Sequence, residues 1–216
     1  MKICGIRTVA AALAAADAGA DAVGFVFWEG SRRRVSPEEA AAIARVLPPF
    51  VVRVGVFVDG DPEWIDRIRR DVGLDALQLH GNEPPAVCAR IGGRVIKALR
   101  VRDGTVVQQA RDYDVAAILL DTYLEGMVGG TGRSFDWSLA GDVGRPLILS
   151  GGLTAANVGD AIRRVRPYAV DVSSGVETDG QKDPAKIAAF VAAVRAADAV
   201  AAWAPGGVPP SRRPLG

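Results

Sequence analysis

The sequence predicts a single (β/α)8 barrel, the TIM-barrel fold, and three observations support this prediction. Short runs of β-branched and aliphatic residues alternate with alanine-rich segments along most of the 216 residues. There are eight such strand–helix units, each of roughly 25 residues, which is the length that one strand, one helix and two short loops need. The strands are apolar on both faces, as buried parallel strands are. Eight units favour a closed barrel over an open doubly wound sheet.

Each element can be placed from local signals. The strands are expected at Lys2–Cys4, Ala22–Phe27, Val51–Phe57, Ala76–Leu79, Arg94–Ala98, Ala117–Leu120, Pro146–Leu149 and Ala169–Val172. The helices are expected to begin near Val9, Pro37, Pro62, Pro84, Thr105, Trp137, Asn157 and Pro184. A capping residue precedes proline at Ser36-Pro37, Asp61-Pro62 and Asp183-Pro184. Either Thr154 or Asn157 is expected to cap the seventh helix, and the fifth and sixth helices have the weakest signals.

The barrel is expected to occupy residues 1–197, and residues 198–216 are expected to form a tail outside it. The tail contains the stretch 204–214, which is rich in proline and glycine and has no hydrophobic periodicity. Such a composition cannot bury enough apolar surface to fold. The sequence therefore predicts one barrel domain, which would carry the catalytic site, followed by a disordered tail.

Composition limits the partners and the location of the chain. The formal net charge of +1 gives no electrostatic reason to expect nucleic acid or an anionic membrane as a partner. No apolar stretch reaches the length of a membrane span, and no signal peptide is visible at the N-terminus. Two cysteines, Cys4 and Cys88, are too few for a disulfide framework. We expect a cytoplasmic protein that acts on a small molecule.

Metal and nucleotide sites find no support in the sequence. The chain has one histidine and two distant cysteines, which do not have the spacing of metal ligands. No glycine-rich nucleotide-binding motif follows a strand. We expect neither a metal ion nor an organic cofactor.

The active site of such a barrel lies at the C-terminal ends of its strands. After the seventh strand comes Ser150-Gly151-Gly152, and after the eighth comes Ser173-Ser174-Gly175. Paired glycines let backbone N–H groups approach an anion, and a short helix start points further amides at it. Each loop alone is an ordinary tight turn. Together, after the last two strands, Gly151, Gly152, Ser173 and Ser174 predict a phosphate site.

Two strand ends carry residues suited to acid–base chemistry. Cys4 ends the first strand beside Gly5, and Lys2 lies on the same strand face, where its ammonium would favour the thiolate. Asp121 follows the sixth strand, and a glycine-rich stretch at residues 126–132 comes next as a candidate lid. A buried thiol is otherwise simply a packing residue, and an acid after a strand is otherwise a helix cap. The strand-end positions favour function for both.

Polar residues at two further strand ends face the same site. Gln78 and His80 alternate onto one face at the end of the fourth strand. The second strand leads into three consecutive arginines, Arg32, Arg33 and Arg34. Arginines in a loop usually form a solvated rim, but one of them facing an anionic ligand can clamp a carboxylate.

In combination these segments resemble the phosphoribosylanthranilate isomerase family of tryptophan biosynthesis. The resemblance covers about residues 1–197 and rests on segments 2–6, 19–27, 31–37, 54–58, 78–83, 119–122, 129–132, 135–137, 149–153 and 171–177. Other phosphate-binding barrels share the last two loops but not the start at Cys4-Gly5 together with the segment Gln78 to Gly81. The chain departs from the family pattern at one position. In relatives an aromatic residue often follows the position of Arg33, whereas this chain has Arg34 there.

The resemblance implies an Amadori rearrangement without a metal or cofactor. It implies that Asp121 is the general acid and Cys4 the general base. It also implies that Arg33, Gln78, His80 and Asp171 bind the substrate, with the choice among the three arginines left open. Family members include monomers and dimers, so the expected partner beyond the phosphorylated substrate is at most a second copy of the chain.

Two other functions remain open at the level of sequence. A related sugar-phosphate isomerase barrel, as in histidine biosynthesis, would use an aspartate as the first-strand base, where this chain has Cys4. A phosphate-ligand sensor that lost its activity would not need an acid, a base and the phosphate loops together. Both alternatives fit the sequence less well than the isomerase.

Overall fold

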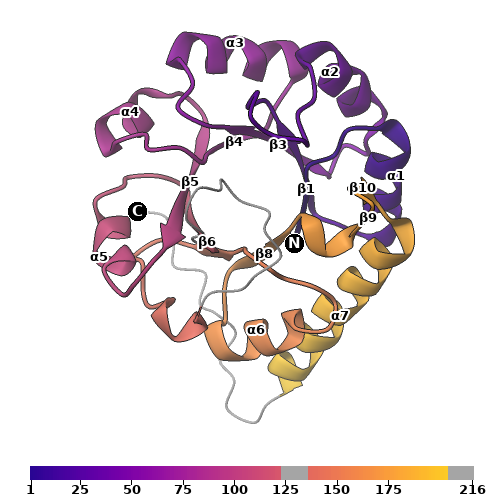
Figure 1. Cartoon of the computed structure of the whole chain (residues 1–216), viewed down its shortest axis with the longest axis vertical. Coiled ribbons are helices and arrows are strands. Elements are labelled where there is room, and N and C mark those ends of the chain that lie inside the picture. The colour runs from indigo at the N-terminus through magenta and orange to yellow at the C-terminus, as the bar shows by residue number, and fades with distance from the viewer. Residues whose placement is uncertain (123–135, 204–216) are drawn as a thin grey trace.

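The predicted barrel is confirmed. The computed structural model describes the backbone of residues 1–122 and 136–203, and the side chains of residues 1–122 and 136–199. Eight parallel strands follow one another in chain order, and the eighth pairs with the first, which closes the barrel. Seen down the barrel, the helices form a ring outside the strands (Figure 1).

The elements lie close to their expected places. The barrel strands are β1 (Lys2–Cys4), β2 (Ala22–Val26), β3 (Val52–Phe57), β4 (Ala76–Leu79), β5 (Arg94–Val101), β6 (Ala117–Thr122), β7 (Leu147–Leu149) and β8 (Ala169–Val172). The α-helices are α1 (Val9–Ala18), α2 (Pro37–Val46), α3 (Pro62–Val72), α4 (Pro85–Arg90), α5 (Val106–Arg111), α6 (Val158–Val165) and α7 (Pro184–Trp203). The described residues also form two 3-10 helices, η1 (Trp137–Leu139) and η2 (Ser174–Val176), and a hairpin of β9 (Glu177–Thr178) and β10 (Gln181–Lys182).

The three caps that were predicted before a proline are all present. Ser36 and Glu39 form a reciprocal capping box at the start of α2. Asp61 accepts two backbone N–H bonds at the start of α3, and Asp183 does the same for α7. These side chains satisfy amides that the helix itself leaves unpaired.

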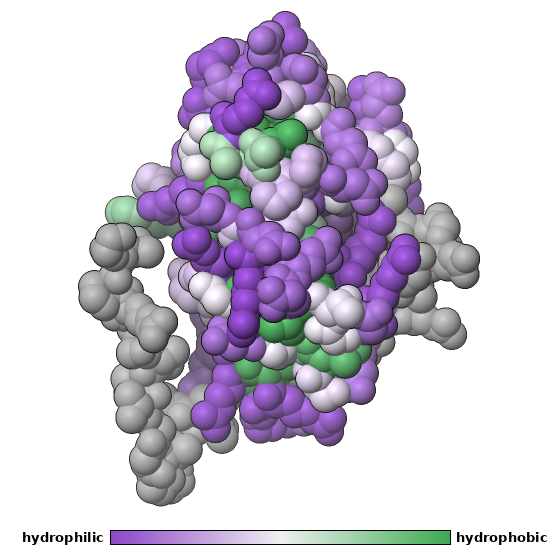
Figure 2. All heavy atoms as spheres, turned by 90° about the vertical axis from the view of Figure 1, so that its left-hand side faces the viewer, coloured by the Kyte–Doolittle hydropathy of each residue, from purple (hydrophilic) through white to green (hydrophobic). Residues whose placement is uncertain are grey.

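The core has two parts because strand side chains alternate between the faces of the barrel wall. The outer part joins strand residues such as Phe25 and Phe57 to helix residues such as Phe190, and each such buried side chain stabilises the fold by about 1.5–3 kcal/mol. The inner part is apolar where Ala98, Leu119 and their neighbours meet inside the barrel. On the face that carries α4 and α5, hydrophilic side chains separate the apolar ones into patches (Figure 2).

The sixth helix was predicted wrongly. The segment starting at Trp137 forms only the 3-10 turn η1, whose first amide is capped by Asp136. Gly141 and Gly144 follow, with Gly144 at a positive φ of 72°, and Pro146 precedes β7. Glycine and proline make continuation of a helix unfavourable, so the chain passes to β7 as a loop.

The cap of the seventh helical segment also differs from expectation. No side chain caps the start of α6. Asn157 instead accepts a bond from the backbone amide of Thr154 and donates one to the carbonyl of Gly152. This side chain therefore fixes the loop after β7 rather than the helix.

Three boundaries are shifted by more than one residue. Strands β5 and β6 extend past Ala98 and Leu120 because Arg100 pairs with Asp121 and Val101 with Thr122, so Asp121 lies inside β6 rather than after it. Helix α7 continues to Trp203, beyond residue 197, where the barrel was expected to end. The candidate lid at residues 126–132 and the rest of the expected tail, 204–216, lie outside the described residues.

Candidate active site

Polar side chains gather inside the barrel at the C-terminal ends of its strands. Buried polar residues there include Lys2, Gln78, Asp121, Ser150 and Asp171. Because burying unpaired polar groups is costly, such a cluster needs partners within the barrel. The strand ends that the sequence pointed to therefore meet in one place.

Cys4 ends β1 and faces the barrel interior. Its side chain packs with Val26 and Val56, and the residue is 8% exposed. Gly24 on the neighbouring β2 makes the room, because a Cβ there would lie 2.9 Å from Sγ of Cys4 and 3.0 Å from Cε of Lys2. The absence of a side chain at Gly24 thus allows the thiol and the ammonium to share this face.

Burial raises the pKa of the Cys4 thiol above its ordinary value, and this is the largest influence on it. The Lys2 and Lys182 ammonium groups act in the opposite direction, while Asp171 raises the pKa further. As expected, Lys2 lowers the pKa of the thiol and so favours the thiolate. The effect of Lys2 does not outweigh that of burial, so the pKa of the thiol stays above its ordinary value.

Asp121 points into the barrel from β6 and is 4% exposed. Its Oδ1 accepts a hydrogen bond of 2.8 Å from the backbone amide of Thr122. Nε2 of His80 lies 3.2 Å from its Oδ2, although the two atoms are not aligned as a hydrogen bond and Nε2 has no other partner among the described residues. The candidate acid therefore has a backbone amide at one oxygen and an imidazole nitrogen near the other.

A chain of buried polar groups crosses the barrel beneath Cys4 and Asp121. Nδ1 of His80 is 2.8 Å from Nε2 of Gln78, and Oε1 of Gln78 accepts a bond of 2.9 Å from Lys2. Lys2 also donates to Oδ1 of Asp171 at 2.8 Å. Burial alone would lower the pKa of Lys2, but Asp171 and Cys4 together outweigh burial and raise it, so Lys2 stays charged. Gln78 is only 1% exposed, and its predicted contact with substrate would depend on its remaining amide hydrogen.

Arg33 is the arginine that turns into the site. Its Nε and Nη2 donate to the two carboxylate oxygens of Glu177 at 2.7 and 2.8 Å, and its Cδ would lie 2.6 Å from a Cβ at Gly5, next to Cys4. The side chains of Arg32 and Arg34 are 66% and 51% exposed. Of the three arginines, Arg33 is thus the one buried next to the strand end that carries Cys4.

The two predicted phosphate loops lie against Asp121 and Cys4. Gly151 and Gly152 have φ values of 86° and 63°, and a Cβ on Gly151 would lie 2.2 Å from Oγ1 of Thr122. A glycine is therefore required for the loop after β7 to pass beside Asp121. On the other side, the hydroxyl of Ser173 donates to the carbonyl of Cys4 at 3.1 Å.

Comparison with known proteins identifies this arrangement. Residues 1–193 match the family model described as N-(5'phosphoribosyl)anthranilate (PRA) isomerase. The chain belongs to the phosphoribosylanthranilate isomerase family.

Relatives match over nearly their whole length. The N-(5'-phosphoribosyl)anthranilate isomerase of Thiobacillus denitrificans is 54% identical over 200 residues, which cover 91% of this chain and 98% of the relative. A crystal structure titled as monomers of the dimeric isomerase from Thermotoga maritima is 44% identical, covers 90% of this chain and 97% of that one, and has a TM-score of 0.81. A structure in complex with reduced 1-(o-carboxyphenylamino)-1-deoxyribulose 5-phosphate is 46% identical, with coverages of 90% and 97% and a TM-score of 0.80.

Two residues of this isomerase site were not singled out from the sequence. Glu177 and Lys182 face each other across the β9–β10 hairpin, and Lys182 donates to Glu177 and to the carbonyl of Ser173. Burial alone would raise the pKa of Glu177, but the bonds from Arg33 and Lys182 outweigh burial and hold it at about 2. The signal was present as Asp179-Gly180, a dipeptide typical of two-residue hairpin turns, and both residues have positive φ.

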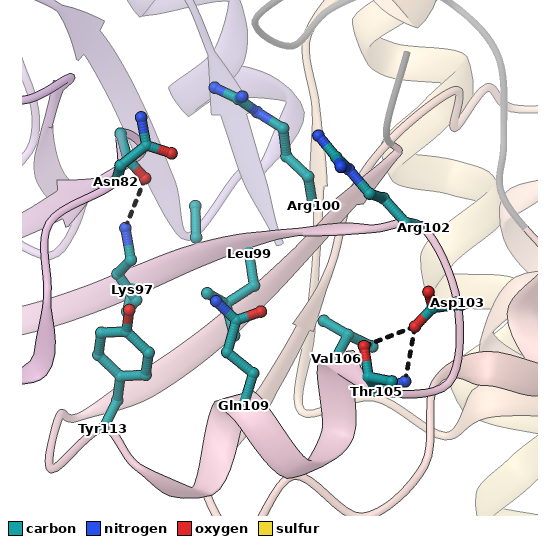
Figure 3. Close-up of a pocket in the computed structure, with 12 residues that line it drawn as sticks. Asn82, Lys97, Leu99, Arg100, Arg102, Asp103, Thr105, Val106, Gln109 and Tyr113 are labelled. Atoms are coloured by element: carbon teal, nitrogen blue, oxygen red, sulfur yellow. Dashed lines mark hydrogen bonds between the residues drawn. The ribbon is translucent and has the colours of Figure 1, made fainter. Parts of the chain in front are cut away.

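A hollow of ≈ 340 Å³ borders this isomerase site between β5 and α5. Lys97, Asn82 and Tyr113 stand at one end of it, while Arg100 on β5 and Arg102 just after this strand point in the same direction (Figure 3). Arg100 donates to the backbone carbonyl of His80 at 3.4 Å.

Lys97 forms a buried ion pair of 2.6 Å with Glu83, which accepts hydrogen bonds from the backbone amides of Asp59 and Gly81. These contacts hold the loop that carries His80.

The described residues show neither a metal cluster nor a membrane helix. No group of three or more histidine, cysteine, aspartate or glutamate side chains in residues 1–122 and 136–199 is arranged to hold a metal ion. Within the same part of the isomerase chain, no helix is long and apolar enough to cross a membrane.

Proposed function

We propose that this protein catalyses the Amadori rearrangement of N-(5-phosphoribosyl)anthranilate to 1-(2-carboxyphenylamino)-1-deoxyribulose 5-phosphate in tryptophan biosynthesis. Relatives of more than half identity carry the name of this enzyme. The observation that supports it most is the placement of the phosphate loops. They follow β7 and β8, the two strands that separate Asp121 on β6 from Cys4 on β1. A sugar anchored there by its phosphate lies between an acid and a base.

In this mechanism Asp121 gives its proton to the furanose ring oxygen. The bond between that oxygen and C1′ breaks, and the anthranilate nitrogen supplies the electron pair that makes an iminium. The Cys4 thiolate then removes the proton from C2′, and the electrons of that bond neutralise the iminium to an enolamine. The enolamine becomes the ketone when C1′ gains a proton and the C2′ hydroxyl loses one. No step requires a redox change, so the chemistry needs only acid and base.

The site residues divide into three groups in this proposal. Cys4 and Asp121 move protons. Backbone amides at Gly151 and Gly152, together with Ser173 and Ser174, hold the phosphate. Arg33, Gln78, His80 and Asp171 bind or orient the rest of the substrate, and Arg33 supplies the positive charge beside the base that an anthranilate carboxylate needs.

The activity is tested by the fluorescence of the anthranilate substrate. Purified protein should consume the fluorescent substrate in a reaction that needs no added metal and that persists after treatment with a chelator. Protein that binds the reduced product analogue but leaves the substrate signal unchanged would contradict the enzyme and favour a ligand sensor.

Replacement of the arginines separates their roles. Arg33→Ala should lower kcat/KM at least about tenfold, because a charge-assisted contact to the substrate and the packing against Gly5 are both lost. Arg32→Ala is the matched control, since the Arg32 side chain is 66% exposed, and it should change kcat/KM by less than about twofold. The reverse order of the two effects would overturn the assignment of Arg33.

We further propose a cytoplasmic location and a monomeric or homodimeric state. Both cysteines are free thiols in the fold, and the proposed base must remain one, which a reducing compartment ensures. The Thermotoga maritima relative is titled as a dimeric isomerase. Sedimentation analysis of the purified chain should give one or two copies, and a larger assembly would contradict this expectation.

A further inference from the structure

We propose that Lys2 and Gln78 fix the tautomer of His80, so that its ring proton lies on Nε2 and faces Asp121. Lys2, Gln78 and His80 then act as positioning residues for the acid. The tautomer follows from the geometry alone, while its effect on catalysis rests on the function proposed above.

The argument begins at Lys2, because an ammonium group can only donate hydrogen bonds. Its Nζ is 2.8 Å from Oδ1 of Asp171 and 2.9 Å from the side-chain amide of Gln78. The amide atom that faces Lys2 must therefore be the oxygen. The opposite orientation would place the amide NH2 group against the ammonium, two donors in contact in a buried site.

The orientation of Gln78 decides the state of the histidine ring. With Oε1 turned to Lys2, the NH2 group of Gln78 faces Nδ1 of His80 at 2.8 Å. Nδ1 must accept this bond and so carries no proton. A neutral imidazole has one N–H, which is then on Nε2. Gln78 is 1% exposed, so water offers little alternative to either contact.

The Nε2–H group lies next to the candidate acid. Nε2 is buried and 3.2 Å from Oδ2 of Asp121, while Oδ1 already accepts the Thr122 amide. A donor beside each oxygen stabilises the carboxylate that remains after Asp121 has given up its proton. The Nε2–Oδ2 contact is not aligned as a hydrogen bond, and active-site contacts of this kind often tighten when the substrate binds. The other tautomer would place a lone pair against the new negative charge.

The tautomer can be measured directly because His80 is the one histidine of the chain. Protein labelled with ¹⁵N only in histidine gives signals from a single ring, and long-range ¹H–¹⁵N correlation spectra distinguish the two neutral tautomers from each other and from the charged ring. Near neutral pH the free protein should show the Nε2–H tautomer. A ring protonated on Nδ1, or a mixture of tautomers, would overturn the proposal without any mutant.

A substitution then tests the cause. Gln78→Glu replaces the NH2 group by a second acceptor oxygen, so a proton should move to Nδ1 of His80, and kcat should fall about ten- to a hundredfold with a smaller change in KM. Gln108→Glu on the exposed face of α5 is the matched control and should leave both the spectrum and kcat unchanged. An unprotonated Nδ1 in Gln78→Glu would refute the fixing of the tautomer, and an unchanged kcat would refute its role in positioning.

Failure of this proposal and failure of the proposed function are distinguishable. The spectrum is recorded without substrate, so it reports the tautomer even if the protein does not convert the fluorescent substrate. If Gln78→Glu does not fold, Gln78→Met, which removes the donor without adding charge, should give a mixture of the two neutral tautomers. A pure Nε2–H signal in that variant would again overturn the proposal.

Discussion

Asp121→Asn should lower kcat by about 10²–10⁴-fold, the usual contribution of a positioned general acid. The amide cannot protonate the ring oxygen of the sugar, yet its size matches the carboxyl group. Its carbonyl oxygen can still accept the bond that the Thr122 amide makes to Oδ1. KM should change little, because the phosphate loops after β7 and β8 remain intact. Initial rates with the fluorescent substrate measure both constants.

The control for this variant is Asp17→Asn on α1, where the aspartate is exposed. It should retain full activity. Binding of the reduced product analogue to Asp121→Asn should remain close to that of the unaltered protein, which would separate loss of chemistry from loss of folding. Full activity in Asp121→Asn would contradict the assigned acid.

Cys4→Ser should lower kcat/KM by about 10²–10⁴-fold, because a serine hydroxyl is a far weaker base than a thiolate. The pH dependence gives a second readout. Burial raises the pKa of Cys4, and Lys2 offsets this only in part. The active form is the deprotonated one, so kcat/KM should increase as the pH rises toward the pKa of the thiol and fall as the pH drops below it. This rising limb should lie on the alkaline side of the usual range for a cysteine.

Cys88→Ser is the matched control for the thiol. Cys88 lies in α4, away from the barrel mouth, with its Sγ directed to the carbonyl of Glu83 at 3.8 Å. The control should keep both the activity and the rising limb, whereas Cys4→Ser should lose the limb with the activity. A profile for the unaltered protein that falls with increasing pH through this range would argue against Cys4 as the base.

Local signals in the sequence were sufficient for the fold, and they singled out the positions of the proposed acid and base. The alternation of apolar runs with capped helices is encoded residue by residue, so the barrel and most helix starts could be predicted. Cys4 and Asp121 were found because a barrel places its chemistry at strand ends, and a strand end is a local property. Where local signals were weak, as at Trp137, the predicted helix was wrong.

Contacts between distant residues were decided only by the tertiary structure. Which of three consecutive arginines enters the site depends on Glu177, 144 residues away along the chain, and on the hairpin that carries Lys182. In the same way, Gln78 meets Lys2 and His80 inside the barrel and so lies beneath the site rather than on its surface. The relative register of strands from opposite parts of the chain sets these distances, and no local pattern of residues records that register. The sequence by itself therefore determined the barrel and which strand ends carry the proposed acid and base, while the tertiary structure decided which side chains surround them.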